Sequence, residues 1–178
     1  MISFPRRAAL RNNTLKLTTL ALTVSFAIIL SYIESRIPAL VAIPGVKIGL
    51  ANIAVIFTLY KLGIKEAAAV SFVRVITVSV LFGSPVSFIY SVSGAAVSLF
   101  SMVLLKKFTP LSEIAVSVVG GVMHNIAQTA AASVILGTNV VIYYLPYLLI
   151  SGSVAGVAIG VVSAVLIKKI NLSHLSKG

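Results

Sequence analysis

The sequence predicts an all-α protein that crosses a membrane several times as one domain. Of its 178 residues, 59% are hydrophobic and only 10% are charged, and the mean hydropathy is +1.13. A soluble domain has roughly 45–50% apolar and about 25% charged residues. This chain therefore lacks the charges that a water-facing surface needs. It also contains apolar runs of about 20 residues, the length that crosses a bilayer core as a helix.

Each predicted span is an apolar run that ends at charged residues or at glycine and proline. The first run ends at Glu34, the third at Gly83 and the fourth at Lys106. Pro146 lies near the start of the last run and predicts a kink or a broken first turn there. The six predicted transmembrane helices in residues 1–178 are 15–33, 46–62, 65–82, 86–105, 110–136 and 140–167.

Two of the acidic residues have a structural interpretation. Glu66 and Glu113 each fall in the first turn of a predicted helix, where a carboxylate stabilises the positive end of the helix dipole by roughly 0.3–1 kcal/mol. Thr109 followed by Pro110 predicts the N-cap and first turn of the fifth helix. We assign no chemistry to either glutamate.

The positions of the basic residues predict the orientation. The chain has 14 Lys and Arg against three Glu, and a formal net charge of +11. With a cytoplasmic N-terminus, 11 of the 14 basic residues fall on the inner side, as the positive-inside rule requires. Both termini are therefore predicted to be cytoplasmic. Because the cations follow the loops and form no single face, no nucleic-acid partner is expected.

The composition excludes several kinds of chemistry. The chain contains no Cys and no Asp, and its only acids are Glu34, Glu66 and Glu113. A thiolate zinc site and a Ser-His-Asp triad are therefore impossible, and the two histidines, His124 and His174, lie on different elements. The chain also lacks a Walker-type phosphate-binding loop. We expect no catalytic residue, metal or cofactor.

Polar residues recur near the midpoints of three predicted spans. Arg74 is the midpoint of the third span and Asn125 of the fifth, and Asn52 lies close to the middle of the second. A charge at the bilayer centre costs at least about 2.5–3.5 kcal/mol, so such a side chain normally faces the interior of the bundle. The three residues predict a polar pocket at mid-membrane depth.

Helical periodicity assigns further residues to the predicted pocket. His124 and Gln128 share one stripe of the fifth helix, and Glu34 and Lys47 are expected at an outer mouth of the pocket. None of the three Glu is expected at the depth of Arg74. An uncompensated buried cation beside neutral donors suits an anionic ligand such as a phosphate, diphosphate or carboxylate. The aliphatic remainder of the wall suits an apolar tail or ring.

Each of these residues also has a structural alternative. Arg74 could bond to backbone carbonyls and neighbouring amides, and His124 could be a packed neutral side chain. The three amide residues could join helices without touching a ligand. Glu34 could pair with Arg36 at the surface. The sequence leaves these alternatives open.

Two helices carry small residues at four-residue spacing, which allows close helix packing in lipid. Gly152, Gly156 and Gly160 form such a ridge in the last span, and Ala21 and Ser25 form one in the first. Either ridge could pack inside the bundle or contact a partner helix. Internal packing is the more common use.

Two segments and one residue between them resemble a known family. They are 44–52 (PGVKIGLAN), Arg74 and 120–128 (GGVMHNIAQ), and they resemble the bacterial Gx transporter family, also labelled heptaprenyl diphosphate synthase component I. That family is similar in size and layout to the substrate-binding S components of energy-coupling factor transporters. The resemblance implies an S-component-like bundle in a bacterial cytoplasmic membrane that captures a small amphipathic or anionic precursor from outside. It also implies docking, through Ala21 and Ser25, on a transmembrane coupling subunit that carries two ATPases.

The second family label gives an alternative function. Prenyl diphosphate synthases carry Asp-rich motifs that bind magnesium, and this chain has no Asp. Under that label the protein would be a non-catalytic membrane subunit associated with polyprenyl diphosphate synthesis. A third alternative is a structural bundle in which the polar residues pair only with one another.

Overall fold

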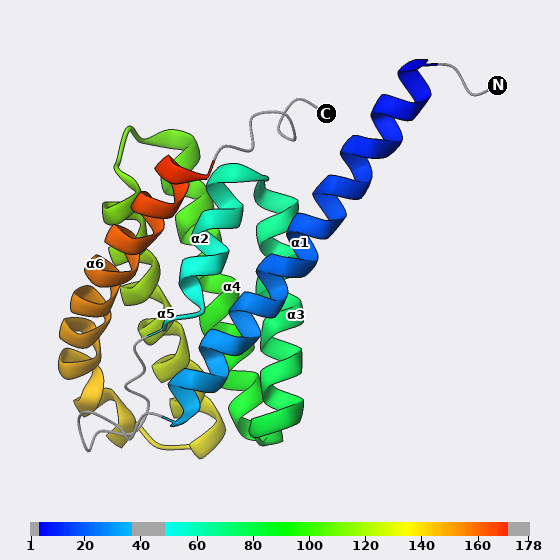
Figure 1. The fold of residues 1–178 in the computed structure, drawn as a ribbon. Coiled ribbons are helices and arrows are strands. Elements are labelled where there is room, and N and C mark those ends of the chain that lie inside the picture. The colour runs from blue at the N-terminus through cyan, green and yellow to red at the C-terminus, as the bar shows by residue number, and fades with distance from the viewer. Residues whose placement is uncertain (1–3, 37–48, 171–178) are drawn as a thin grey trace.

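A computed structural model describes residues 4–36 and 49–170, and over these ranges the chain is helical with no strand. The helices run alternately up and down along the bundle (Figure 1). The prediction of an all-α membrane bundle is confirmed. The elements are α1 (Phe4–Arg36), α2 (Asn52–Lys61), α3 (Ile64–Phe82), α4 (Pro85–Phe108), α5 (Glu113–Leu136), the 3-10 helix η1 (Val140–Tyr144) and α6 (Leu145–Lys169).

Four of the described helical segments are long and apolar enough to cross a membrane. They are Asn12–Arg36, Pro85–Phe108, Glu113–Leu136 and Val140–Lys169. The predicted second span differs, because α2 has 10 residues and is therefore about 15 Å long, half of a bilayer core. The predicted third span corresponds to α3, which has 19 residues. It is not among the four apolar segments because it carries three charged residues, Lys65, Glu66 and Arg74. These two helices complete the bundle between longer neighbours.

The ends of the helices follow local sequence signals, with one correction. The Ser84 hydroxyl accepts a hydrogen bond from the Ser87 N–H at 3.2 Å and caps α4. The predicted cap of α5 at Thr109 is wrong: Ser112 caps this helix. Thr109 instead ends α4, with its hydroxyl donating to the Leu105 carbonyl at 2.6 Å. A residue before proline disfavours helical geometry, so Thr109 is extended and cannot begin the next helix.

The predicted break near Pro146 is confirmed. A 3-10 helix, Val140–Tyr144, precedes α6, and Pro146 lies in the first turn of α6, where its missing N–H costs nothing. Before this segment Gly137 ends α5 with a φ of 62°, a left-handed conformation that glycine adopts easily.

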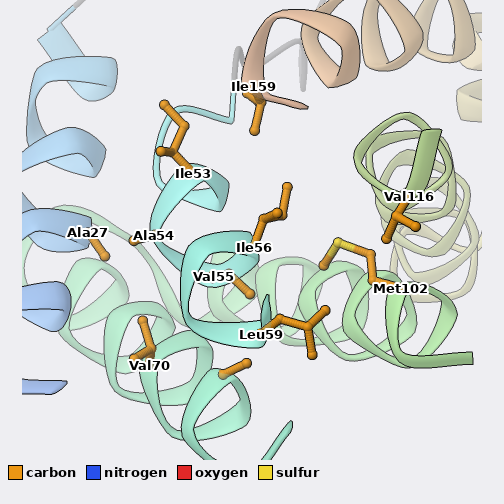
Figure 2. Close-up of a cluster of buried hydrophobic side chains, with 11 residues drawn as sticks. Ala27, Ile53, Ala54, Val55, Ile56, Leu59, Val70, Met102, Val116 and Ile159 are labelled. Carbon is orange, nitrogen blue, oxygen red and sulfur yellow. The ribbon is translucent and has the colours of Figure 1, made fainter. Parts of the chain in front are cut away.

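The short helix α2 lies at the centre of the hydrophobic core. Its residues 53–59, apolar except for Thr58, are all buried, so every face of the helix is covered. Figure 2 shows five of these side chains among core residues of the surrounding helices: Ile53, Ala54, Val55, Ile56 and Leu59. The surrounding core residues include Ala27 of α1, Val70 of α3, Met102 of α4, Val116 of α5 and Ile159 of α6.

The glycine ridge of α6 packs against α5. A Cβ on Gly156 would lie 2.6 Å from the Val118 Cα, and one on Gly160 would lie 2.7 Å from the Ile114 Cα. Backbone contacts this close leave no room for a side chain. Of the two alternatives for this ridge, internal packing is therefore the one that the structure shows.

Most of the described cations lie at one end of the bundle, which we call the cation-rich end. There Lys16 of α1 pairs with Glu66 of α3 at 2.6 Å. The start of α1 and the end of α6 both lie toward this end (Figure 1). Arg36 lies at the opposite end, where its guanidinium is 5.0 Å from the centre of the Tyr32 ring. The other members of the cation-rich end are Lys61, Lys65, Lys106, Lys107, Lys168 and Lys169.

Candidate functional site

A cavity of about 280 Å³ lies between the helices, and each of the described helices α1 to α6 contributes to its wall. The apolar part of the wall includes Ile56, Val75, Met102 and Ile159. Its polar side chains are Ser31, Glu34, Ser35, Asn52, Arg74, Ser79, Ser87, Ser91, Ser117, His124, Asn125 and Gln128. The structure therefore brings six of the predicted site residues together around one space.

Arg74 comes to this cavity from the middle of α3. Its Nε is buried and has no hydrogen-bond partner among the residues that the structure describes. Neighbouring Ser71 and Val75 are buried in the bundle. Burying a guanidinium N–H without a partner costs free energy, and the Arg74 side chain brings this cation to the cavity wall.

The Glu34 carboxylate lines the same cavity as Arg74 and interacts with Arg74 electrostatically. The two side chains form no direct ion pair. Glu34 instead accepts a hydrogen bond from the backbone N–H of Gly49. It makes no surface pair with Arg36.

The amide of Asn125 joins two helices. Its Nδ2 donates to the Leu148 carbonyl of α6 at 2.6 Å. Gly152 makes room for this contact, since a Cβ there would lie 2.6 Å from the Asn125 Nδ2. Asn125 thus has the structural role that we left open as an alternative, in addition to its place in the cavity wall.

His124 and Gln128 lie side by side against α4. Gly94 provides their space: a Cβ on Gly94 would lie 2.8 Å from the His124 Cε1 and 2.9 Å from the Gln128 Cγ. Gln128 makes no hydrogen bond within the described part of the chain. Gln128 also forms part of the cavity wall.

The remaining predicted residues have separate positions. Asn52 is the first residue of α2 and lines the cavity. Lys47 lies outside the described residues. Ala21 and Ser25 are exposed on α1, away from the cavity, and the Ser25 hydroxyl donates to the Ala21 carbonyl at 3.0 Å.

Sequence reasoning missed the contribution of α4. Ser87 and Ser91 line the cavity, and with Gly94 and Ser98 they follow one stripe of that helix. The four-residue spacing that identified the fifth helix as polar is present here too. Serines are common in membrane helices, however, and one stripe of them gives a weaker signal than an arginine or a histidine.

The groups in the cavity wall determine which ligands it can hold. Within the described ranges, no group of three or more His or Glu side chains could hold a metal ion. The cavity offers the Glu34 carboxylate as an acceptor and, beside it, the Arg74 guanidinium, the His124 imidazole, neutral amides and hydroxyls, and an aliphatic wall. These groups can donate to a phosphate or carboxylate and can pack against hydrocarbon.

Comparison with known proteins identifies the family. Residues 23–166, about four fifths of the chain, match the family described as heptaprenyl diphosphate synthase component I. No curated protein and no solved structure matches the chain. The matched range includes the described cavity residues from Ser31 to Ile159. The chain therefore belongs to the heptaprenyl diphosphate synthase component I family.

Proposed function

We propose that this protein is a membrane-embedded binding subunit that holds a small anionic or amphipathic molecule in its central cavity. The observation that carries the proposal is the buried Arg74 guanidinium, whose Nε has no partner within the described residues. A buried cation is stable only with an anionic or well-bonded partner. The Glu34 carboxylate balances part of the Arg74 charge from a distance. The same carboxylate accepts a hydrogen bond from the Gly49 N–H.

The start of α2 also borders the cavity, where its first N–H groups donate to the carbonyls of residues 49–51 and the Glu34 carboxylate accepts from Gly49. This helix begins part of the way along the bundle (Figure 1), and its first residue, Asn52, lines the cavity. The N-terminus of a helix carries a partial positive charge, and broken helices in membrane proteins direct such ends at anionic groups near the midplane. Arg74 and the α2 N-terminus thus favour the same charge in the same space.

We propose a binding role because the chain lacks the groups for most group-transfer chemistry. It has no Asp and no Cys, and only one of its three Glu, Glu34, lines the cavity. The leading proposal is an S-component-like subunit in a bacterial cytoplasmic membrane. It would capture its ligand from outside and dock on a transmembrane coupling subunit with ATPases. The exposed α1 face with Ala21 and Ser25 would provide the contact.

The family description favours a second candidate. It names a component of heptaprenyl diphosphate synthesis, so the protein could be the non-catalytic membrane subunit of that reaction. Both candidates use the same cavity and an anionic head group. They differ in the partner, which gentle co-purification identifies: a coupling subunit with ATPases supports the first, and a soluble Asp-rich synthase supports the second.

The binding role itself is tested by titrating inorganic diphosphate into the purified protein. We expect Arg74→Gln to weaken binding by about 10- to 100-fold, the value of a hydrogen bond to a charged group. Arg74→Lys should retain part of the affinity because it keeps the charge but loses the planar fork. Arg36→Gln is the matched control, since Arg36 is exposed and lies against Tyr32. Equal affinity in Arg74→Gln and the wild type would overturn the proposal.

A further inference from the structure

Two side chains of opposite charge line the central cavity without forming an ion pair. Glu34 comes from the end of α1 and Arg74 from the middle of α3. They interact electrostatically, yet within the described residues no ion pair joins them. Charged side chains inside membrane-spanning bundles usually pair with one another or with backbone carbonyls, and they mark substrate sites. Two opposite charges that share a cavity and do not meet therefore point to a ligand that contacts both.

Each of the two groups has bonding capacity that the described residues do not use. The Oε1 atom of Glu34 accepts from the Gly49 N–H, while its other oxygen makes no hydrogen bond or ion pair with a described residue. A carboxylate can accept about four hydrogen bonds. The guanidinium of Arg74 only donates, and its buried Nε has no partner among the described residues. One cavity thus offers an acceptor for a cationic group and a donor to an anionic group.

The formal charges of these two side chains cancel. Glu34 contributes one negative charge and Arg74 one positive charge to the described wall. A simple anion at Arg74 would add a negative charge near Glu34, and an unbalanced charge in a poorly solvated space costs free energy. A ligand with one negative and one positive group keeps the cavity neutral and gives both side chains a partner.

The size and the neutral part of the wall restrict the ligand to a compact polar molecule. The volume of about 280 Å³ lies just below the roughly 300–1,000 Å³ of ordinary small-molecule sites. The amides of Asn52 and Gln128 supply neutral donors and acceptors, and Ile56 and Val75 supply apolar surface. A few methylene groups between two charged ends suit such a wall.

We propose that the cavity binds a small zwitterion, with a carboxylate at Arg74 and a protonated amine at Glu34. This inference rests on the proposed binding function and adds the class of ligand: an amino acid-like molecule in place of a simple anion. Glu34 is then a specificity-determining residue, because its carboxylate selects for the amine and disfavours an anion that lacks one. Arg74 holds the anionic group in either case.

The test compares zwitterions with anions of the same chain length. β-Alanine, γ-aminobutyrate and δ-aminovalerate are titrated into the purified protein at neutral pH and constant ionic strength. Each is compared with propionate, butyrate or valerate, which lacks only the amine. We expect the zwitterion whose length spans the two side chains to bind the wild type about 10- to 100-fold more tightly than its matched anion, the value of a hydrogen bond between charged groups.

Two variants assign this preference to its residue. Glu34→Gln should remove the preference, because Gln keeps an oxygen that can accept from Gly49 but loses the charge that pairs with the amine. Glu113→Gln is the matched control, since it removes the same charge from a residue in the first turn of α5, outside the cavity wall. This control should keep the full preference for the zwitterion.

Two results would overturn the zwitterion assignment. One is equal affinity of the wild type for every zwitterion and its matched anion, and this result does not depend on how any variant folds. The other is a folded Glu34→Gln protein that keeps the full preference. In both cases the binding of diphosphate at Arg74 would still stand. Failure of the proposed function would appear differently, as equal diphosphate affinity in the wild type and Arg74→Gln.

Discussion

The Glu34 carboxylate of α1 accepts a hydrogen bond from the backbone N–H of Gly49, just before α2 begins. This bond joins the end of the first helix to the start of the buried second helix at the wall of the central cavity. Glu34 also interacts electrostatically with Arg74 across the cavity. One acidic side chain thus contributes to the position of α2 and to the charge balance of the site.

Replacing Glu34 with Gln should strengthen the binding of anions. Gln keeps an oxygen that can accept from Gly49 but removes the negative charge near Arg74. We expect the affinity for inorganic diphosphate to rise by about 3- to 10-fold, since a like charge in a partly buried site disfavours the ligand. Competition binding at constant ionic strength measures the change. A fall in affinity would contradict this prediction and would mean that the Glu34 carboxylate contacts the ligand.

Asn125 and Gln128 should respond differently to truncation. Asn125→Ala removes the 2.6 Å bond to the Leu148 carbonyl, and hydrogen bonds between membrane helices contribute about 0.6–1.7 kcal/mol. Thermal unfolding in detergent should therefore show a lower midpoint for Asn125→Ala. Gln128→Ala should unfold like the wild type, because the Gln128 amide makes no hydrogen bond within the described residues. Equal loss of stability in both variants would argue against separate roles.

Lys106 should stabilise the bundle more than its neighbour Lys107. The Lys106 Nζ donates to the Leu59 carbonyl at 2.5 Å and lies 4.8 Å from the centre of the Tyr60 ring. We expect Lys106→Met to lower the free energy of unfolding by about 1 kcal/mol. Lys107→Met removes the same charge from the same helix end, but Lys107 is exposed. Thermal unfolding of the two variants gives the comparison, and indistinguishable midpoints would refute the role of Lys106.

Gly156 should not tolerate a larger side chain. Because a Cβ there would lie 2.6 Å from the Val118 Cα, Gly156→Val must separate α5 from α6. We expect a loss of about 1–3 kcal/mol or more, the usual cost of overpacking. Ala158→Val, at an exposed position two residues further along α6, should have little effect. The fraction of folded protein after heating in detergent distinguishes them, and a stable Gly156→Val protein would contradict the close packing.

Much of the bundle could be predicted because a membrane helix is indicated by a local apolar run in the sequence. Apolar length and the charged residues between runs gave the number and order of the α-helices, and Pro146 gave the broken start of α6. The residue at which α2 begins was less predictable. Nothing in the apolar run from Val46 to Leu62 indicates that the helix begins at Asn52, because that start depends on contacts with α1 and α6.

The site was predictable where a residue is costly in a membrane and less so elsewhere. Arg74 and His124 were found because polar groups at mid-depth normally face the interior. The hydrogen bond from the Gly49 N–H to the Glu34 carboxylate was not predicted, because nothing in the sequence shows which backbone group that carboxylate contacts. Ser87 and Ser91 were missed because serine costs little in lipid-embedded helices and so carries a weak signal.

The central claim is that Arg74 holds an anionic ligand, and native mass spectrometry of the protein released gently from its own membranes tests it most directly. We predict that the wild type carries a small molecule of defined mass with a phosphate, diphosphate or carboxylate group. The folded Arg74→Gln variant should lack it, and Arg36→Gln should retain it. An Arg74→Gln protein that carries the same molecule in the same amount would contradict the account.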